Sequence, residues 1–136
     1  MTDKSPARSV PHSVPPELTI ALHRARVKPG MELEATRWMD MLNERLVEAE
    51  ATLDREMMAL EIVFRSTEAD GDYLTWVSVH GDGESVESST HPLDVDHLAF
   101  DRNVRERGWT GGEVQLLLAP AAIRAAIASW AADAKP

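Results

Sequence analysis

The sequence has no cysteine among its 136 residues. It therefore has no disulfide, no cysteine-based zinc site and no thiol nucleophile, which fits a cytoplasmic protein. No apolar run approaches the roughly 18 residues that a membrane-spanning helix needs. The first sixteen residues also lack the apolar core of a secretory signal.

Basic residues are scarce relative to acidic ones. The chain has 14 Lys and Arg against 23 Asp and Glu, a formal net charge of -9. Nucleic acids and anionic membranes both favour basic surfaces, so neither is expected as a partner. The acidity is read as a contribution to solubility. A hydrophobic content of 43% is enough for the core of one domain.

Proline is concentrated at the start of the chain, where four of the eight prolines fall within residues 1–16. With no hydrophobic periodicity, this stretch is expected to be a disordered or extended leader. Residues 17–134 are expected to form a single domain.

Hydrophobic periodicity predicts alternating strands and helices in that domain. An Asp-Gly pair at Asp70-Gly71 indicates a hairpin turn between the second and third strands. The expected strands are 17–27, 57–65, 73–80 and 113–119, and the expected helices are 31–55, 93–107 and a terminal helix that starts at Pro120.

The order β-α-β-β-α-β with an extra C-terminal helix is the pattern of an α+β, ferredoxin-like fold. Its usual strand order, 4-1-3-2, makes the first strand central and places two helices on one sheet face. The other face has only the last helix to cover it. We therefore expect a homodimer that packs sheet face against sheet face.

Six motifs stand out along the domain: LHRARVKPG from Leu22, WMDMLNER from Trp38, the pair Glu56-Met57, DGDYLTW from Asp70, HPLDVDHLAF from His91 and LLLAP from Leu116. Together they resemble a family of small bacterial proteins that is catalogued as a domain of unknown function. The resemblance covers about residues 17–125. The architecture also resembles the dimeric α+β barrel superfamily, which includes small-substrate monooxygenases, lactone isomerases and haem-binding enzymes. This resemblance implies a small-molecule pocket between sheet and helices.

Three titratable residues are the candidates for catalysis. His23 lies on the expected central strand between two alanines, which leave room for an acid/base ring. Glu61 interrupts an apolar strand, where a carboxylate needs a partner or a raised pKa. His97 occupies the inward stripe of the second helix and should point at the sheet. The alternatives are satisfied core histidines and, for Glu61, an ion pair with an arginine.

Arg24, Trp76 and His80 are the candidates for substrate binding. Trp76 and His80 share one face of the third strand, and Trp76 could stack on a flat ligand, with core packing as the alternative. Arg24 could hold an anionic group near the first helix, or form an ion pair with one of the many acids. Alternation alone leaves open whether Trp76 shares a face with His23 or Glu61, because a one-residue shift in register swaps every side chain.

No HxH, HxxxH or HExxH spacing occurs, so neither a metal nor another cofactor is expected. A metal held by His23, Glu61 and His97 is the less favoured alternative. The expected function is binding of a small molecule in a pocket between sheet and helices. His-based acid/base catalysis of the isomerase, lyase or cofactor-independent monooxygenase type would act there. The alternative is a non-catalytic binding or accessory protein that acts as a structural dimer.

Overall fold

A computed structural model of the chain describes residues 10–132. It has the α+β architecture that the sequence predicts, with a four-stranded sheet and four α-helices in this part of the chain. The elements are β1 (Thr19–Arg26), α1 (Glu32–Glu44), α2 (Leu46–Glu56), β2 (Met58–Glu68), β3 (Gly71–His80), a short 3-10 helix η1 (Val86–Ser88), α3 (Pro92–Val104), β4 (Thr110–Gly112) and α4 (Ala121–Ala132).

The sheet has the strand order β2-β3-β1-β4, and every neighbouring pair is antiparallel. The first strand is therefore in the interior, as expected, and β2 is at an edge. The predicted turn at Asp70-Gly71 joins β2 to β3, and Gly71 has a φ of +139°. Only glycine adopts this backbone region without strain.

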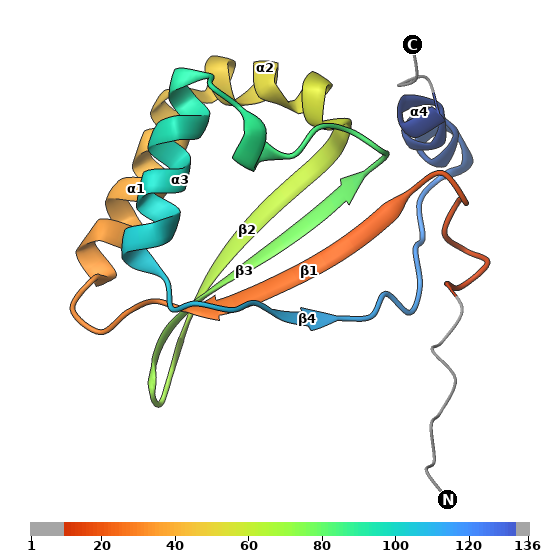
Figure 1. Cartoon of the computed structure of the whole chain (residues 1–136). Coiled ribbons are helices and arrows are strands. Elements are labelled where there is room, and N and C mark those ends of the chain that lie inside the picture. Colours follow the sequence, from red (N-terminus) through yellow and green to blue (C-terminus); the bar gives the residue numbers. More distant parts are fainter. Residues whose placement is uncertain (1–9, 133–136) are drawn as a thin grey trace, which may run out of the picture.

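Helices α1, α2 and α3 lie on one face of the sheet, and α1 and α3 run side by side (Figure 1). An amphipathic stripe on each helix faces the sheet and excludes water from the core between them. The buried centre of this core consists of Val27, Ala35, Trp38, Leu74 and Val104.

Helix α4 stands apart from the other three helices (Figure 1). Its Ala131 joins a second buried cluster with Val14, Leu18 and Val79. Val79 points away from the face that α1–α3 cover, so α4 covers one end of the opposite face. Of the expected leader, residues 10–16 contribute Val14 to this cluster, and residues 1–9 lie outside the described part. Within residues 10–132, no helix is both long and apolar enough to cross a bilayer.

The prediction of a single helix over residues 31–55 is wrong, because two helices, α1 and α2, meet there at Arg45. Arg45 has a φ of -102° and a ψ of 38°, outside helical geometry. Its guanidinium pairs with Asp96 on α3 at 2.6 Å and with Glu48 on α2 at 2.8 Å. A tertiary contact therefore accompanies the break, and periodicity along one helix does not reveal it.

The prediction of a strand over residues 113–119 is also wrong. The last strand, β4, ends at Gly112, and the chain then leaves the sheet edge. The backbone N–H of Leu117 donates to Ser13 at 3.1 Å, and its carbonyl accepts from Arg124 at 2.7 Å. These side chains replace the strand partners that the apolar pattern implied.

The helix expected over 93–107 ends earlier, at Val104. Arg105 is extended, with a φ of -103° and a ψ of 152°, and forms a bridge with Val27 next to β1. Gly108, with a φ of +85°, lies in the loop that follows rather than at the cap position. Helix α3 thus ends where Arg105 pairs with Val27, before the chain reaches Gly108.

Leu74→Ala should lower the free energy of unfolding by about 2–5 kcal/mol, because it removes a fully buried side chain and leaves a cavity. Urea denaturation measures the change. Leu33→Ala, at a position on α1 that is 61% exposed, is the matched control and should cost well under half as much. Equal losses in the two variants would contradict this account of the core.

Candidate functional site

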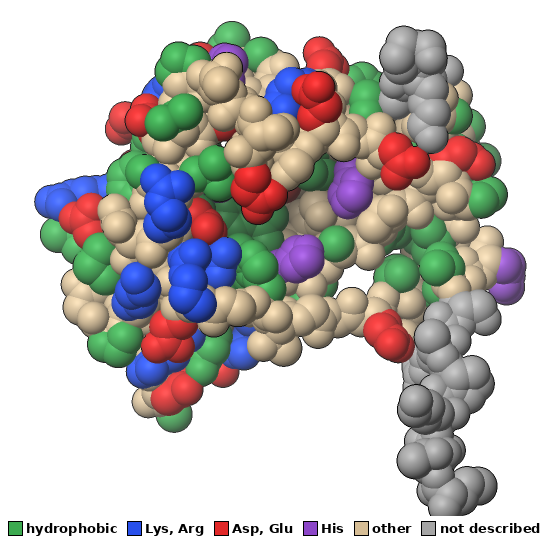
Figure 2. All heavy atoms as spheres, in the orientation of Figure 1, with side chains coloured by type: hydrophobic (Ala, Val, Ile, Leu, Met, Phe, Trp, Pro, Cys, Tyr) green, Lys and Arg blue, Asp and Glu red, His purple; other side chains and the backbone are tan. Residues whose placement is uncertain are grey.

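A cavity of about 620 Å³ lies between the helical layer and the sheet face that it covers. Residues from α1, α2, α3, β1, β2 and β3 line it, together with η1 and Trp109. Figure 2 shows a hollow with hydrophobic side chains at its base and acidic and histidine side chains near its rim. The volume is in the range of pockets that hold small molecules.

Strand register brings the predicted site residues to the same sheet face. His23 on β1 is opposite Trp76 on β3, and Trp76 is opposite Val63 on β2. Glu61 is opposite Ser78, two residues from Trp76 on the same face. Residues directly opposite one another in a sheet point to the same side. His23, Glu61 and Trp76 therefore share a face, and all three line the cavity.

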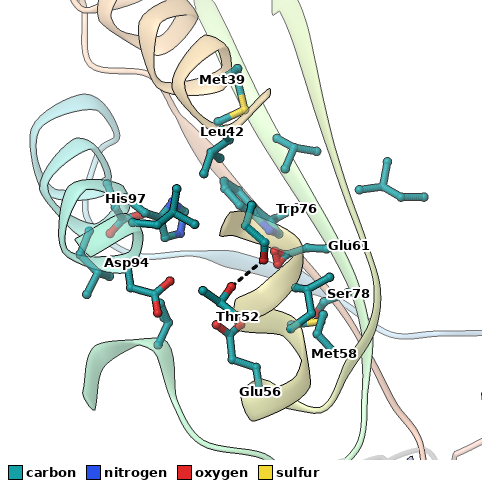
Figure 3. Close-up of a pocket in the computed structure, with 18 of the residues that line it drawn as sticks. Met39, Leu42, Thr52, Glu56, Met58, Glu61, Trp76, Ser78, Asp94 and His97 are labelled. Carbon is teal, nitrogen blue, oxygen red and sulfur yellow. Dashed lines mark hydrogen bonds between the residues drawn. The ribbon is translucent and has the colours of Figure 1, made fainter. Parts of the chain in front are cut away.

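His97 approaches the same cavity from α3 (Figure 3). The indole N–H of Trp38 donates to its Nδ1 atom at 3.0 Å. Its ring centroid lies 5.4 Å from those of both Trp38 and Trp76. Burial lowers the pKa of His97, because the charged imidazolium is poorly solvated there, while the nearby Asp101 and Asp94 oppose the shift.

Glu61 points into the cavity from β2, near Trp76 (Figure 3). Burial raises the pKa of Glu61, a hydrogen bond from Trp76 opposes the rise, and the negative charge of Asp94 adds to it. A carboxylate with a raised pKa accepts a proton more readily than an exposed one. This is the property required of a general base near neutral pH.

Glu56, at the last position of α2, is a second carboxylate with a perturbed pKa. Burial, with the charges of Glu61 and Asp94, raises the pKa of Glu56 to about 7. The following residue, Met57, is left-handed, with a φ of 54°, and ends the helix. Its carbonyl accepts a hydrogen bond from the N–H of Gly81 at 3.0 Å, so the loop after β3 holds the end of α2 in place.

The close approach of this loop requires glycine at position 83. A Cβ atom there would collide with the backbone of Glu56 and Met57. The next residue, Glu84, donates its N–H to the carbonyl of Arg55 at 3.0 Å. The loop therefore fixes the backbone that carries Glu56.

Carboxylates outnumber basic groups beside the cavity where α2 and α3 approach each other. Asp94 on α3 is only 3% exposed and pairs with Arg55 at 3.1 Å. The same guanidinium lies 3.2 Å from Glu84 and 3.7 Å from Glu56. Arg55 is therefore shared among three carboxylates, and Glu61 adds a fourth acid nearby.

The open side of the cavity is built from His23, Trp109, Arg105 and Asp101. The His23 side chain is exposed, and its ring centroid lies 5.7 Å from that of Trp109. The guanidinium of Arg105 stacks over Trp109 at 3.8 Å and pairs with Asp101 at 2.6 Å. His23 is on an interior strand, as the sequence led us to expect. The glycines of the neighbouring strand β4 leave its ring uncovered.

Two predicted binding residues, Arg24 and His80, do not line this cavity. Alternation along β1 places Arg24 on the opposite sheet face, where it pairs with Glu68 and stacks over Tyr73. This is the ion pair that the sequence offered as the alternative. His80 is on the last residue of β3, and its Nδ1 lies 2.7 Å from the carbonyl oxygen of Gly81, within its own loop.

Sequence reasoning missed Glu56, Asp94, Arg105 and Trp109 as parts of the site. Asp94 could have been found, because it lies three residues before His97, on the same side of a helix. Arg105 and Trp109 come to the cavity only because α3 ends early, which the sequence did not indicate. Within residues 10–132, no group of three or more His, Asp or Glu side chains is arranged to hold a metal ion.

Glu56→Gln should flatten the dependence of stability on pH. The pKa of Glu56 lies at about 7 in the folded protein, above its ordinary value of 4.5. The folded state therefore binds this proton more tightly, and the free energy of unfolding falls as pH rises from the lower value to the higher. We expect the variant to gain about 1–2 kcal/mol relative to wild type between about pH 5 and about pH 8, as measured by urea denaturation.

Glu50→Gln, at an exposed position on the same helix, is the matched control for the loss of one carboxylate from α2. An equal change of the pH profile in both variants would show that the effect does not come from the buried position of Glu56.

Comparison with known sequences and structures gives one match. Residues 18–125 fit the profile of a family of unknown function, DUF6176, which agrees with the range of the motifs described above. No curated protein and no solved structure matches the chain. Because the family match spans most of the 136 residues, the protein belongs to the family of unknown function DUF6176.

Proposed function

We propose that the protein binds a small organic molecule in the cavity between sheet and helices. There it catalyses a proton transfer to or from this molecule, as an isomerase or lyase does. One observation carries the proposal: Glu61, His97 and Trp76 line the same cavity, with His23 at its open side. Strand pairing and helix packing bring these residues together from four separate elements. A purely structural core would not require two histidines and several carboxylates around a cavity of this size.

Glu61 is the proposed base. Burial raises the pKa of this carboxylate, and the hydrogen bond from Trp76, which opposes the rise, orients it beside the cavity. The indole ring of Trp76 offers a flat apolar surface next to it, suited to an unsaturated or cyclic ligand. His23 lies where the cavity meets water, so its proposed role is to exchange protons between the site and solvent.

Exchange of a ligand C–H for deuterium should depend on Glu61. A library of small molecules, which contains neutral ketones as well as amines and carboxylates, is first screened for binding by ligand-detected NMR. Bound compounds are then incubated with the protein in heavy water. Glu61→Gln should slow the exchange about 100-fold or more, because an amide cannot accept the proton.

Glu50→Gln is the control, since Glu50 is an exposed carboxylate at the rim of the same cavity. Binding without exchange in the wild type would favour the non-catalytic binding or accessory role. Absence of binding by every compound in the library would remove the support for both roles.

The second part of the proposal concerns assembly. The sheet face opposite the cavity exposes a group of apolar side chains away from α4. Leu22, Val77 and Ile62 are aligned across three strands on this face, and Phe64 is 56% exposed beside them. A patch of this kind on an acidic protein points to a partner with an equally apolar surface. We propose that a second copy of the chain covers it, giving a ferredoxin-like homodimer of the dimeric α+β barrel type.

Phe64→Glu should convert the dimer to a monomer, because a carboxylate buried in an apolar interface has no partner. Size-exclusion chromatography with light scattering gives the mass of each species. Leu33→Glu, which changes an equally exposed leucine on α1, should leave the dimer intact. A monomeric wild type, or a Phe64→Glu variant that remains dimeric, would contradict the proposed interface.

A further inference from the structure

The hydrogen bond between Trp38 and His97 determines where the imidazole carries its proton. The indole nitrogen of Trp38 is only a donor, and it lies 3.0 Å from Nδ1 of His97. An imidazole nitrogen accepts a hydrogen bond only when it is unprotonated. The ring is therefore the neutral tautomer with its proton on Nε2.

The surroundings of His97 favour this neutral form. Protonation of Nδ1 would place two N–H groups against each other, and Trp38 is fully buried and cannot turn away. The ring packs on two uncharged indoles, those of Trp38 on α1 and Trp76 on β3. The charged groups near it are Asp94 and Asp101 on its own helix. Burial outweighs them and lowers the pKa of His97.

The remaining ring nitrogen, Nε2, is free to meet a ligand. It has no hydrogen-bond partner among the described residues, and His97 lines the cavity (Figure 3). Nε2 is also not fully buried. In residues 10–132, the sole fully buried side-chain nitrogen or oxygen without a partner is Nε of Arg26.

We propose that His97 presents its Nε2–H group to an oxygen atom of the ligand, and that the pocket takes neutral carbonyl compounds rather than carboxylates or phosphates. This rests on the proposed function. Arg55 is already shared among Asp94, Glu84 and Glu56, so it does not offer an unpaired positive charge to an anion. Arg105, at the open side, is paired with Asp101 through two hydrogen bonds.

This arrangement matches the removal of a proton from a carbon next to a carbonyl group. Glu61 takes the proton, the electron pair of the broken C–H bond forms a C=C bond, and the π pair of the C=O bond moves to oxygen. The Nε2–H group of His97 holds that oxygen, since a neutral imidazole can serve as the polarising donor. When the ligand also carries a C=C bond next to the deprotonated carbon, the enolate is conjugated with it. Return of the proton from Glu61 to the far carbon of that C=C bond, with the C=O bond re-formed from the electron pair on oxygen, completes an isomerisation without any further reactant.

The tautomer can be measured without a ligand. Long-range proton–nitrogen NMR spectra of the full chain distinguish protonated from unprotonated ring nitrogens. We expect His97 to have its proton on Nε2 at neutral pH in the wild type. Trp38→Phe keeps an aromatic ring and removes the donor, so it should mix the two tautomers. Trp109→Phe, the same change beside His23, should leave His97 as it is. A wild-type ring that is protonated on Nδ1 would overturn the proposal.

The ligand class is tested with three probes of similar shape: acetophenone, benzoate and α-methylstyrene. Acetophenone should shift the Nε2 signal of His97 and bind about three- to ten-fold more tightly than α-methylstyrene, which lacks the oxygen. Benzoate should bind more weakly than acetophenone because of the surrounding carboxylates.

The outcomes separate this inference from the proposed function. Equal binding of acetophenone and α-methylstyrene, with no change at Nε2, would overturn the role of His97 and leave the small-molecule pocket standing. Benzoate binding more tightly than acetophenone would overturn the ligand class. Failure of all three probes to bind, with the Nε2–H tautomer present, would count against the pocket function as well.

Discussion

The buried indole of Trp38 is the point on which both the core and the candidate site depend. Its ring fills the space between α1, α3 and β3, and it stacks on Phe100 with a centroid distance of 6.4 Å. A buried indole N–H requires an acceptor, and here that acceptor is Nδ1 of His97. The packing that stabilises the fold therefore also orients a polar ring toward the cavity. A hydrophobic residue in place of His97 would leave that N–H unsatisfied, at a cost of about 1–3 kcal/mol.

Two tryptophans each donate a hydrogen bond to a polar group of the site. Trp38 donates to His97, and a hydrogen bond from Trp76 acts on the Glu61 carboxylate. In each case a rigid, largely apolar side chain supplies a single donor. Such donors limit the positions that a ligand-facing group can adopt, which is what preorganisation of a site requires.

Much of the fold could be predicted from periodicity. The alternation in the first three strands and the stripe on α1 identified the sheet and its main cover, because these patterns report burial directly. The failures all occurred where a distant residue overrides the local pattern. Asp96 pairs with Arg45 at the break between α1 and α2. Ser13 and Arg124 hydrogen-bond to the backbone of Leu117. Val27 pairs with Arg105 where α3 ends.

The candidate site was only partly predictable, for a related reason. His23, Glu61 and His97 stood out because a titratable residue interrupted an apolar pattern. Which sheet face His23 and Glu61 occupy depends on strand register, and a local pattern does not contain that information. A bulge between Met58 and Leu60 illustrates the point. It puts Met58 and Glu61 on the same side of β2, although strict alternation would separate them.

The contact between Gly83 and the end of α2 links a loop residue to the acidity of the site. The glycine is exposed and does not line the cavity. Even so, any side chain at this position would push the loop away from the backbone of Glu56. A substitution at position 83 would therefore alter the surroundings that raise the pKa of Glu56, although residue 83 does not line the cavity.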